Sequence, residues 1–296
     1  MIIGIANIIP GLSGATLAFI LGIYQKLIQV LTRFDTKLIF LLKNRNIKEV
    51  KKYISFNFLI SILIGIVISF VALAKVLNFL FTHFELYTWS YFFGIIAGSI
   101  FYIIKYIDRW TKLESLLFIC GLCISLGLLF VEPNLENKNL IFCFICGVIA
   151  IVGMLVPGLS GSYLLVLLGN YKLILVTTIK NITNPTLINQ ENYFYVKLFI
   201  TFLFGQIIGV LMFSRLIKWL IEKYKNPTFS TLAGFVTGSL IYIWPWQNNL
   251  QELQLIYNLS LPTFTKHSDL YSILIIVIGI LTIIGIEKLA EKYQNV

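Results

Sequence analysis

The sequence predicts an all-α polytopic membrane protein built from two inverted repeats. Hydrophobic residues occupy 58% of the 296 positions and charged residues only 12%, with a mean hydropathy of +0.88. This composition excludes a soluble globular domain. The string Pro-Gly-Leu-Ser-Gly occurs twice, at 10–14 and 157–161, and the apolar segments after each copy share further glycine, serine and tyrosine positions. The chain is therefore expected to contain one unit repeated.

Each Pro-Gly-Leu-Ser-Gly string predicts a break in an apolar helix. Pro10 and Pro157 lack an amide hydrogen and disfavour helix at the preceding residue, while the glycines accept backbone angles that other residues resist. In lipid, a break must be buried in protein or line a polar cavity, since every backbone N–H and C=O needs a partner. The new helix start, near Ser13 or Ser160, would attract an anion. A tight-packing kink between helices is the alternative interpretation.

The first repeat is expected to cover 1–131. Its break lies in a re-entrant hairpin at 1–31, because the residues before Pro10 form only about 13 Å of helix, roughly half the hydrocarbon thickness. Three transmembrane helices are predicted at about 56–81, 87–106 and 115–131. Between hairpin and helices, 34–55 mixes apolar and basic residues. Either an amphipathic segment on an anionic leaflet or a solvated loop would have this pattern.

The second repeat is expected to cover 132–296, with a hairpin at about 140–179 and helices at about 198–221, 229–244 and 270–286. An offset of 147 residues pairs Gly22 with Gly169 and Tyr24 with Tyr171. The longer apolar segment before Pro157 leaves open whether this second hairpin is re-entrant or spans the membrane. Each repeat contains an odd number of crossings, so the two must insert in opposite orientations, as in many secondary transporters.

Basic residues orient the chain. The hairpin interpretation places both termini in the cytoplasm together with a cluster of seven cations: Arg33, Lys37, Lys43, Arg45, Lys48, Lys51 and Lys52. A fully spanning first segment would put this cluster outside, against the positive-inside rule. The net charge of +10 does not indicate nucleic acid, because the cations are dispersed and no nucleic-acid motif accompanies them. No cleavable signal peptide is expected, since no basic segment precedes the first apolar run.

Small residues and cations recur at an offset of 140. Gly94 and Gly98 pair with Gly234 and Gly238, small-residue faces expected to seat the hairpins. Lys75 pairs with Arg215 in apolar surroundings, where a cation either faces the protein interior or snorkels to an interface. We expect Arg215 to bind phosphate, since a guanidinium can donate two parallel hydrogen bonds.

Two Cys-x-x-Cys pairs resemble a zinc-binding pattern in their spacing. They are Cys120 with Cys123 and Cys143 with Cys146. Both pairs lie in apolar segments that offer no polar side chains to support a metal. We therefore expect no metal site and no cofactor, and interpret the cysteines as small packing residues.

The two break segments, 5–16 and 154–162, resemble those of the polyprenyl-phosphate translocases of bacteria and archaea, known as domain of unknown function 368. That family's motif reads roughly Asn-(apolar)₂-Pro-Gly-x-Ser-Gly-Gly-Thr in the first half and Pro-Gly-x-Ser-Gly-Ser in the second; Ala15 replaces its second glycine. The resemblance implies a multi-pass plasma-membrane transporter of a prokaryote. It would flip undecaprenyl phosphate from the outer to the inner leaflet for reuse in cell-wall synthesis. The expected substrate-binding residues are Asn7, Pro10, Gly11, Ser13, Gly14, Thr16, Pro157, Gly158, Ser160, Gly161, Ser162, Arg215 and Lys75.

Two other functions are alternatives to lipid transport. Undecaprenyl-pyrophosphate phosphatases also have re-entrant hairpins, but such chemistry needs acidic groups and an arginine at the break. Gly14 and Gly161 stand where that arginine would be, and neither motif contains Asp or Glu, so we expect a transporter rather than an enzyme. A small-anion channel or exchanger fits the breaks equally well. The expected partners are polyprenyl phosphate and membrane lipids; the residues leave open the driving ion and whether the chain forms a homo-oligomer.

Overall fold

The computed structural model describes residues 14–131, 135–178, 181–182, 190–246, 260–263 and 267–294. These residues form helices and connecting turns, without a strand among them. The first half contains α2 (Gly14–Ile20), α3 (Tyr24–Thr32), α4 (Thr36–Lys43), α5 (Ile47–Tyr53), α6 (Phe56–His83), α7 (Glu85–Lys105), α8 (Lys112–Gly127) and the 3₁₀ turn η1 (Leu128–Phe130). The second contains α9 (Leu140–Leu155), α10 (Gly161–Leu167), the π-helical η2 (Lys172–Thr178), α12 (Gln190–Lys223), α13 (Lys225–Ser239), η3 (Leu240–Ile243) and α14 (His267–Gln294).

The short helices that follow the two motifs have the same local structure. Helices α2 and α10 each contain seven residues, and their bounds are offset by the 147 residues that separate the motifs. Each ends at a left-handed glycine, Gly22 with φ 67° and Gly169 with φ 75°. The N–H of each glycine donates to the carbonyl three residues earlier, and the next N–H donates to the carbonyl five residues earlier. This is the hydrogen-bond pattern of a Schellman C-cap, which glycine favours because it has no Cβ.

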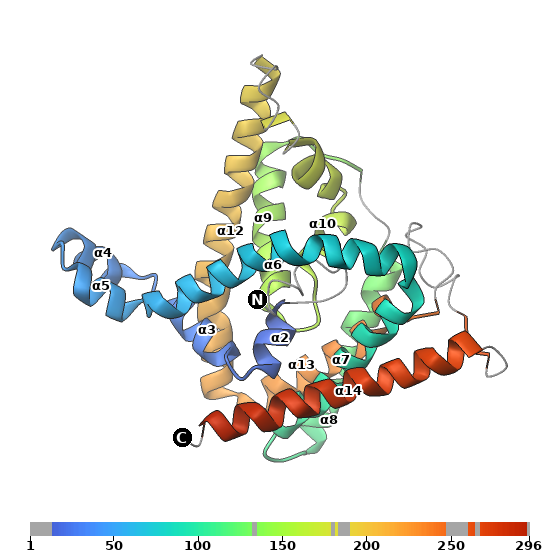
Figure 1. Ribbon diagram of the computed structural model, residues 1–296. Helices are drawn as coiled ribbons and strands as arrows, with labels where there is room; N and C mark the ends of the chain where they lie inside the picture. Colours follow the sequence, from blue (N-terminus) through green and yellow to red (C-terminus); the bar gives the residue numbers. More distant parts are fainter. Residues whose placement is uncertain are drawn as a thin grey trace.

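The longer helices pack in pairs, and two of the three main pairs join the two halves of the sequence. Helix α7 packs along α14, and α13 packs along α8, while α12 packs along α9 (Figure 1). A Cβ at Gly94 would overlap the carbonyl oxygen of Ile276 in α14, and one at Gly234 would overlap that of Phe118 in α8. The small-residue faces thus permit close helix approach as predicted. The expectation that they seat the hairpins is wrong, because their partners are the last long helices of each half.

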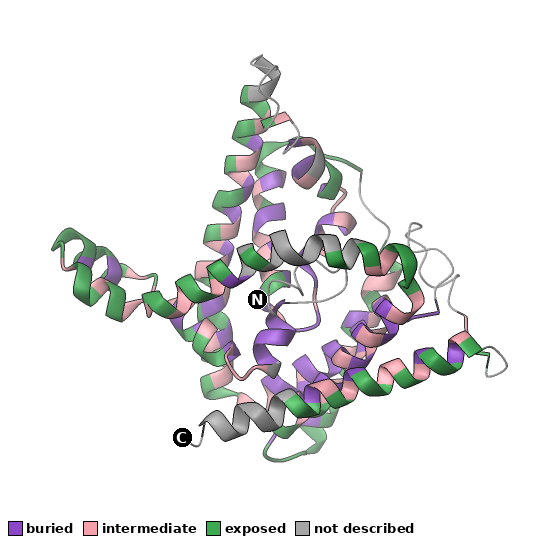
Figure 2. Cartoon of the chain, in the orientation of Figure 1, coloured by how far each residue is buried: buried purple, intermediate pink, exposed green. Residues whose placement is uncertain are grey.

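Four described helical segments are long and apolar enough to cross a membrane: Glu85–Lys105, Lys112–Phe130, Tyr193–Lys223 and His267–Gly285. Shorter apolar segments are Phe56–Gly65 and Leu140–Leu155. The predicted span at 229–244 differs from the structure, in which α13 has 15 residues and continues into the 3₁₀ helix η3. Many outward faces of the long helices are exposed and apolar, while buried residues concentrate on their inner faces (Figure 2).

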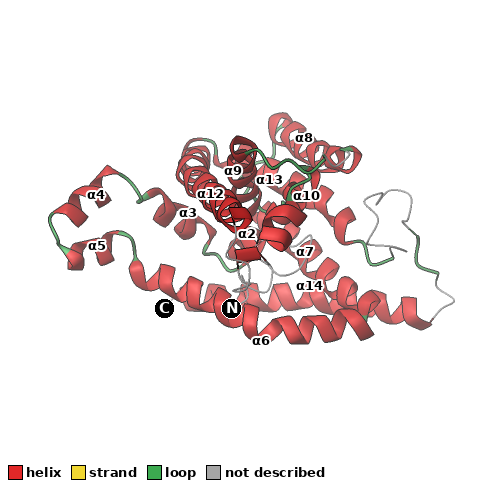
Figure 3. Cartoon of the chain, turned by 90° about the horizontal axis from the view of Figure 1, so that it is seen from above, coloured by secondary structure: helices red, strands yellow, loops and turns green. Residues whose placement is uncertain are grey.

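The core surrounds α2, which lies centrally among the helices in both views (Figures 1 and 3). Phe19 of α2 is 3% exposed. Its ring centroid lies 5.5 Å from that of Tyr24, 5.2 Å from that of Tyr106 and 5.3 Å from that of Phe229. These distances suit edge-to-face and tilted aromatic pairs. The segment directly after the first motif is therefore fixed by α3, the end of α7 and the start of α13.

Candidate functional site

The second motif forms a break between α9 and α10. Helix α9 ends at Leu155, and Val156 has an extended backbone with ψ 121°, as the residue before a proline requires. Gly158 follows with φ 84°, in the left-handed region that glycine tolerates. Ser160 then precedes the first residue of α10 with an extended backbone. The proline and glycines therefore act as the sequence predicts, and the whole turn is packed inside the protein.

Helices α2 and α3 contact this break directly. The N–H of Gly158 donates to Oγ1 of Thr16 over 2.8 Å, a buried bond between residues of the two motif regions. The hydroxyl of Tyr24 donates to the carbonyl oxygen of Leu155 over 2.9 Å, and the Tyr24 side chain is 1% exposed. That carbonyl belongs to the last turn of α9, where helix carbonyls lack intrahelical partners. The first-half segment thus supplies one acceptor and one donor to the broken backbone of the second.

Two serine hydroxyls lie together at the start of α10. Oγ of Ser160 and Oγ of Ser162 are 2.8 Å apart and form a hydrogen bond. Ser160 is 9% exposed, and Ser162 is half-buried. Each hydroxyl can donate one bond and accept two. The pair therefore keeps further hydrogen-bonding capacity for a polar ligand at the break.

The glycines of the break contact protein backbone. A Cβ at Gly158 would lie 2.9 Å from the Cα of Val236 in α13. A Cβ at Gly161 would overlap the carbonyl oxygen of Ala150 in α9. Both glycines are therefore required for helix packing, in addition to any approach of a ligand. This close packing is the feature that the kink interpretation expects, so larger residues here would disturb the fold itself.

The structure does not bring all the predicted site residues together. Asn7, Pro10, Gly11 and Ser13 lie outside the described residues, while Gly14 begins α2 and is buried, as is Pro157. Lys75 belongs to α6, and its side chain is outside the described part. Arg215 is exposed on α12, and its Nη2 donates to the carbonyl oxygen of Phe34 over 3.1 Å. Arg215 therefore contacts the connection between α3 and α4, and no contact in the described part joins it to Thr16 or Ser160.

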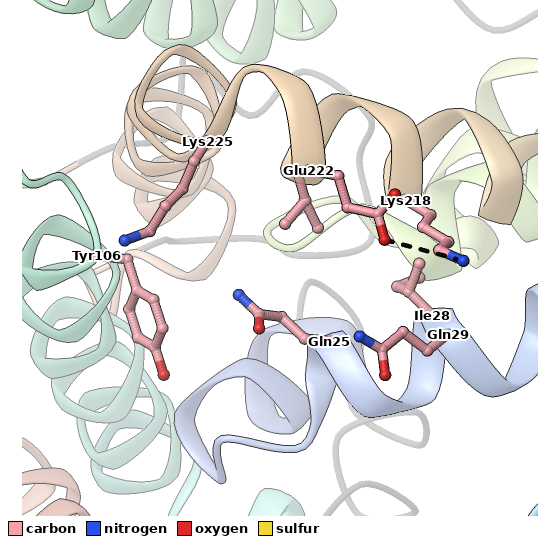
Figure 4. A pocket seen from close by; sticks show the side chains of 8 residues that line it. Gln25, Ile28, Gln29, Tyr106, Lys218, Glu222 and Lys225 are labelled. Atoms are coloured by element: carbon pink, nitrogen blue, oxygen red, sulfur yellow. Dashed lines mark ion pairs between the residues drawn. The ribbon is translucent and has the colours of Figure 1, made fainter.

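A polar pocket lies beyond the break, along α3. Its cavity of about 380 Å³ is lined by Gln25, Ile28, Gln29, Tyr106, Lys218, Ile221, Glu222 and Lys225 (Figure 4). The glutamines come from α3, and the lysines and glutamate from the end of α12 and the start of α13. Nζ of Lys218 lies 3.8 Å from a carboxylate oxygen of Glu222, whereas Nζ of Lys225 binds both oxygens of Asp108 at 2.9 and 3.0 Å.

The pocket is adjacent to the core around α2. The Tyr106 ring packs against Phe19, and its hydroxyl lies 3.0 Å from that of Tyr102. The pocket was not predicted from the sequence. The sequence feature that indicates it is the spacing of two polar pairs. Gln25 and Gln29 are four residues apart on one helix face, and so are Lys218 and Glu222. The amides of Gln25 and Gln29 and the Tyr106 hydroxyl offer hydrogen-bond donors, and each of the two lysines has a carboxylate partner, so the pocket suits a polar group.

The cysteines divide into two environments. Cys143 and Cys146 are fully buried on α9, where the amide of Asn170 donates to Sγ of Cys143 over 3.5 Å. Cys120 and Cys123 are exposed on α8, so the interpretation as packing residues holds for the second pair and is wrong for the first. Within the described residues, no group of three or more His, Cys, Asp or Glu side chains could hold a metal ion.

One protein-family model matches the chain over most of its length. The sequence model of the undecaprenyl phosphate translocase-like family matches residues 3–260, a range that includes both motifs. The chain belongs to this family. The resemblance stated from residues 5–16 and 154–162 is therefore confirmed over most of the chain.

Two curated relatives are similar to the chain. A polyprenyl-phosphate transporter of Vibrio cholerae serotype O1 is 32% identical over 304 aligned positions, covering 98% of this chain and 94% of the relative. A polyprenyl-phosphate transporter of Staphylococcus aureus is 27% identical over 203 positions, covering 64% of this chain and 69% of the relative. Both relatives are named as transporters, in agreement with the expectation of a transport protein. No solved structure matches the chain.

Proposed function

We propose that this protein flips polyprenyl phosphate, with undecaprenyl phosphate as the expected species, from the outer to the inner leaflet of a prokaryotic plasma membrane. The observation that carries the proposal is the buried bond from the Gly158 N–H to Oγ1 of Thr16. It places the segment after the first motif directly against the second break. Membership in the translocase-like family supplies the chemical class of the substrate.

The phosphate is proposed to bind where the two breaks meet. A phosphate in the membrane interior requires preorganised donors, because its desolvation is otherwise costly. The hydroxyls of Ser160 and Ser162 bond to each other, and the one that accepts in this bond keeps its own O–H to donate to the phosphate, while Thr16 orients the backbone beside them. From the sequence, Ser13 with Asn7, Pro10, Gly11 and Gly14 is expected to complete the site. Neither motif contains a carboxylate or arginine, which favours transport of an intact phosphate over its hydrolysis.

The chain is proposed to consist of two inverted repeats, 1–131 and 132–296. Two features support this arrangement. Helices α2 and α10 have equivalent bounds and equivalent glycine caps. Helix α7 packs on α14 as α13 packs on α8, so the second long helix of each half contacts the last helix of the other. A two-fold axis relating the halves would exchange these two contacts.

The polar pocket along α3 is proposed to receive the phosphate headgroup on the cytoplasmic side of the break. Its size of about 380 Å³ suits a small ligand or headgroup, so the polyprenyl tail would remain in lipid outside it. The exposed ion pair of Lys218 with Glu222 contributes little to stability and leaves the ammonium available to a stronger anion. Tyr106 connects the pocket to the aromatic core around α2.

A leaflet-resolved transport assay tests the function. The purified chain is placed in liposomes that contain undecaprenyl phosphate, and the lipid in the outer leaflet is measured over time with a membrane-impermeant probe. We expect its disappearance to require the protein. A matched experiment measures uptake of radiolabelled inorganic phosphate and chloride without the lipid. Uptake of small anions without lipid movement would instead identify an anion channel or exchanger.

Cysteine labelling tests the proposed topology, which places both termini in the cytoplasm. Single cysteines replace Asn44, Asn137 or Asn258 in a variant that lacks the native cysteines. We expect labelling from the cytoplasmic side at Asn44 and from outside at Asn137 and Asn258. Labelling of Asn44 from outside would refute the inverted-repeat arrangement, because the positive-inside argument depends on that loop.

A further inference from the structure

Helices α4 and α5 form a hairpin that projects from the rest of the protein (Figures 1 and 3). The two helices pack on each other, with Leu38 and Leu41 of α4 buried. The turn between them includes Arg45 with φ 52°, and the N–H of Asn46 donates to the carbonyl oxygen of Leu41 over 3.2 Å. The segment is thus a folded helical unit rather than a solvated loop.

The base of this hairpin is fixed by hydrogen bonds. Asp35 accepts from the N–H of Leu38 over 3.1 Å and from the Tyr53 hydroxyl over 2.7 Å. Nη1 of Arg33 donates to the carbonyl oxygen of Tyr53 over 2.7 Å. These bonds join the start of α4 to the end of α5. The hairpin therefore holds its outer surface in a defined orientation.

That surface carries four large apolar side chains that nothing in the described part covers. The exposed fractions are 66% for Ile39, 62% for Phe40, 56% for Leu42 and 66% for Ile47. In a hairpin surrounded by water, exposing four large apolar side chains on one small unit would be unfavourable. They indicate an apolar phase or partner beside the hairpin.

The charge on the same segment identifies that partner. Residues 33–55 contain seven cations against two acidic residues, Asp35 and Glu49. Asp35 is engaged by Tyr53 and Leu38, while Lys43, Arg45, Lys48, Lys51 and Lys52 are exposed. Apolar side chains combined with an excess of lysine and arginine match the interfacial region of an anionic leaflet. A neutral protein surface would match the apolar residues but leave the cations without counter-charges.

We propose that the α4–α5 hairpin is an interfacial anchor bound to anionic phospholipids. Ile39, Phe40, Leu42 and Ile47 enter the region below the headgroups, and the cations contact lipid phosphates. The anchor is also joined to the longer helices of the protein. It connects α3 to α6, and Arg215 of α12 donates to Phe34 at its base. The proposal does not depend on which molecule the protein transports.

An environment-sensitive fluorophore tests this inference in the full-length protein. Phe40→Cys, in a variant without the native cysteines, is labelled with a nitrobenzoxadiazole probe and placed in liposomes of phosphatidylcholine with or without phosphatidylglycerol. We expect blue-shifted emission and protection from aqueous iodide, both stronger with phosphatidylglycerol. Glu49→Cys, an exposed polar position on α5, is the matched control and should remain accessible to iodide.

Removing positive charge from the hairpin distinguishes lipid binding from contact with another protein or with a second copy of this chain. The triple change Lys43→Gln, Lys48→Gln and Lys51→Gln leaves four cations and should weaken the effect of phosphatidylglycerol by about 100-fold, since each cation near an anionic surface favours binding by about fivefold. A probe at position 40 that iodide reaches equally in both lipids would overturn the proposal. Protection that is independent of lipid charge, or that rises with protein density in the membrane, would overturn it in favour of a protein contact or a second copy.

Discussion

Replacing Thr16 by valine tests the contact between the two motif regions. Valine has nearly the same shape as threonine but cannot accept the hydrogen bond from Gly158, which spans 2.8 Å between buried groups. Thr16 is fully buried, so water cannot replace the lost acceptor. A buried N–H without a partner costs about 1–3 kcal/mol, which corresponds to roughly a 5- to 150-fold change in an equilibrium constant. We expect Thr16→Val to destabilise the break by this amount and to slow transport.

Thr16→Ser is the matched comparison. Serine keeps the hydroxyl but removes a buried methyl group, which costs about 1 kcal/mol. The two variants therefore lose comparable stability, while only valine loses the acceptor. Thermal unfolding in detergent measures the stability of each, and the leaflet-resolved assay measures transport. We expect Thr16→Ser to transport faster than Thr16→Val. Equal transport rates in the two variants would refute a role for this bond beyond packing.

Three further predictions address other regions. Lys218→Gln should lower transport several-fold by removing one pocket cation, whereas Lys223→Gln, whose ammonium lies over the Trp219 ring, should not. Burial favours the neutral acid of Asp35, but hydrogen bonds, first from Tyr53, outweigh it and hold its pKa below the ordinary value of 3.8. The stability from the charged form is present above that value and lost as the pH falls through the lowered pKa, so the spin-label distance between α4 and α5 should increase in acid, and Asp35→Asn should remove this dependence. Gly94→Ala should lower the unfolding temperature, as expected for overpacking by about 1–3 kcal/mol, whereas Gly127→Ala, with open space around its Cβ, should not.

Local features were predictable because local chemistry determines them. Pro157 and Gly158 disfavour a continuous helix, and the structure has the break there. Gly22 and Gly169 lie at equivalent positions, and both adopt the left-handed conformation. The basic and apolar residues of 34–55 left an amphipathic segment and a solvated loop as alternatives, and two short helices are found.

Long-range features were less predictable, because a repeat shows which segments are equivalent but not which ones touch. Gly94 and Gly234 indicated close helix packing, but the repeat did not show that Gly279 of α14 lies against Gly94 or that Gly121 of α8 lies against α13. Arg215 was predicted to bind phosphate from its residue type and its position in an apolar segment equivalent to that of Lys75, whereas its observed partner is the Phe34 carbonyl oxygen. The contact of Tyr24 with Leu155 depends on the three-dimensional path of α3.

The helix pairs have a consequence for how this protein can move. Helix α7 packs on α14, and α13 packs on α8. Neither contact has room for a methyl group at Gly94 or Gly234. The helices of each pair therefore cannot shift gradually along each other. Packed surfaces of this kind move as rigid units. Each unit combines a helix from one half of the sequence with a helix from the other. Relative motion of the two units would change the contact of α7 with α13 and the connection between α7 and α8, where Lys225 at the start of α13 binds Asp108. That exposed ion pair contributes little to holding the two units together, so it leaves them free to move against each other.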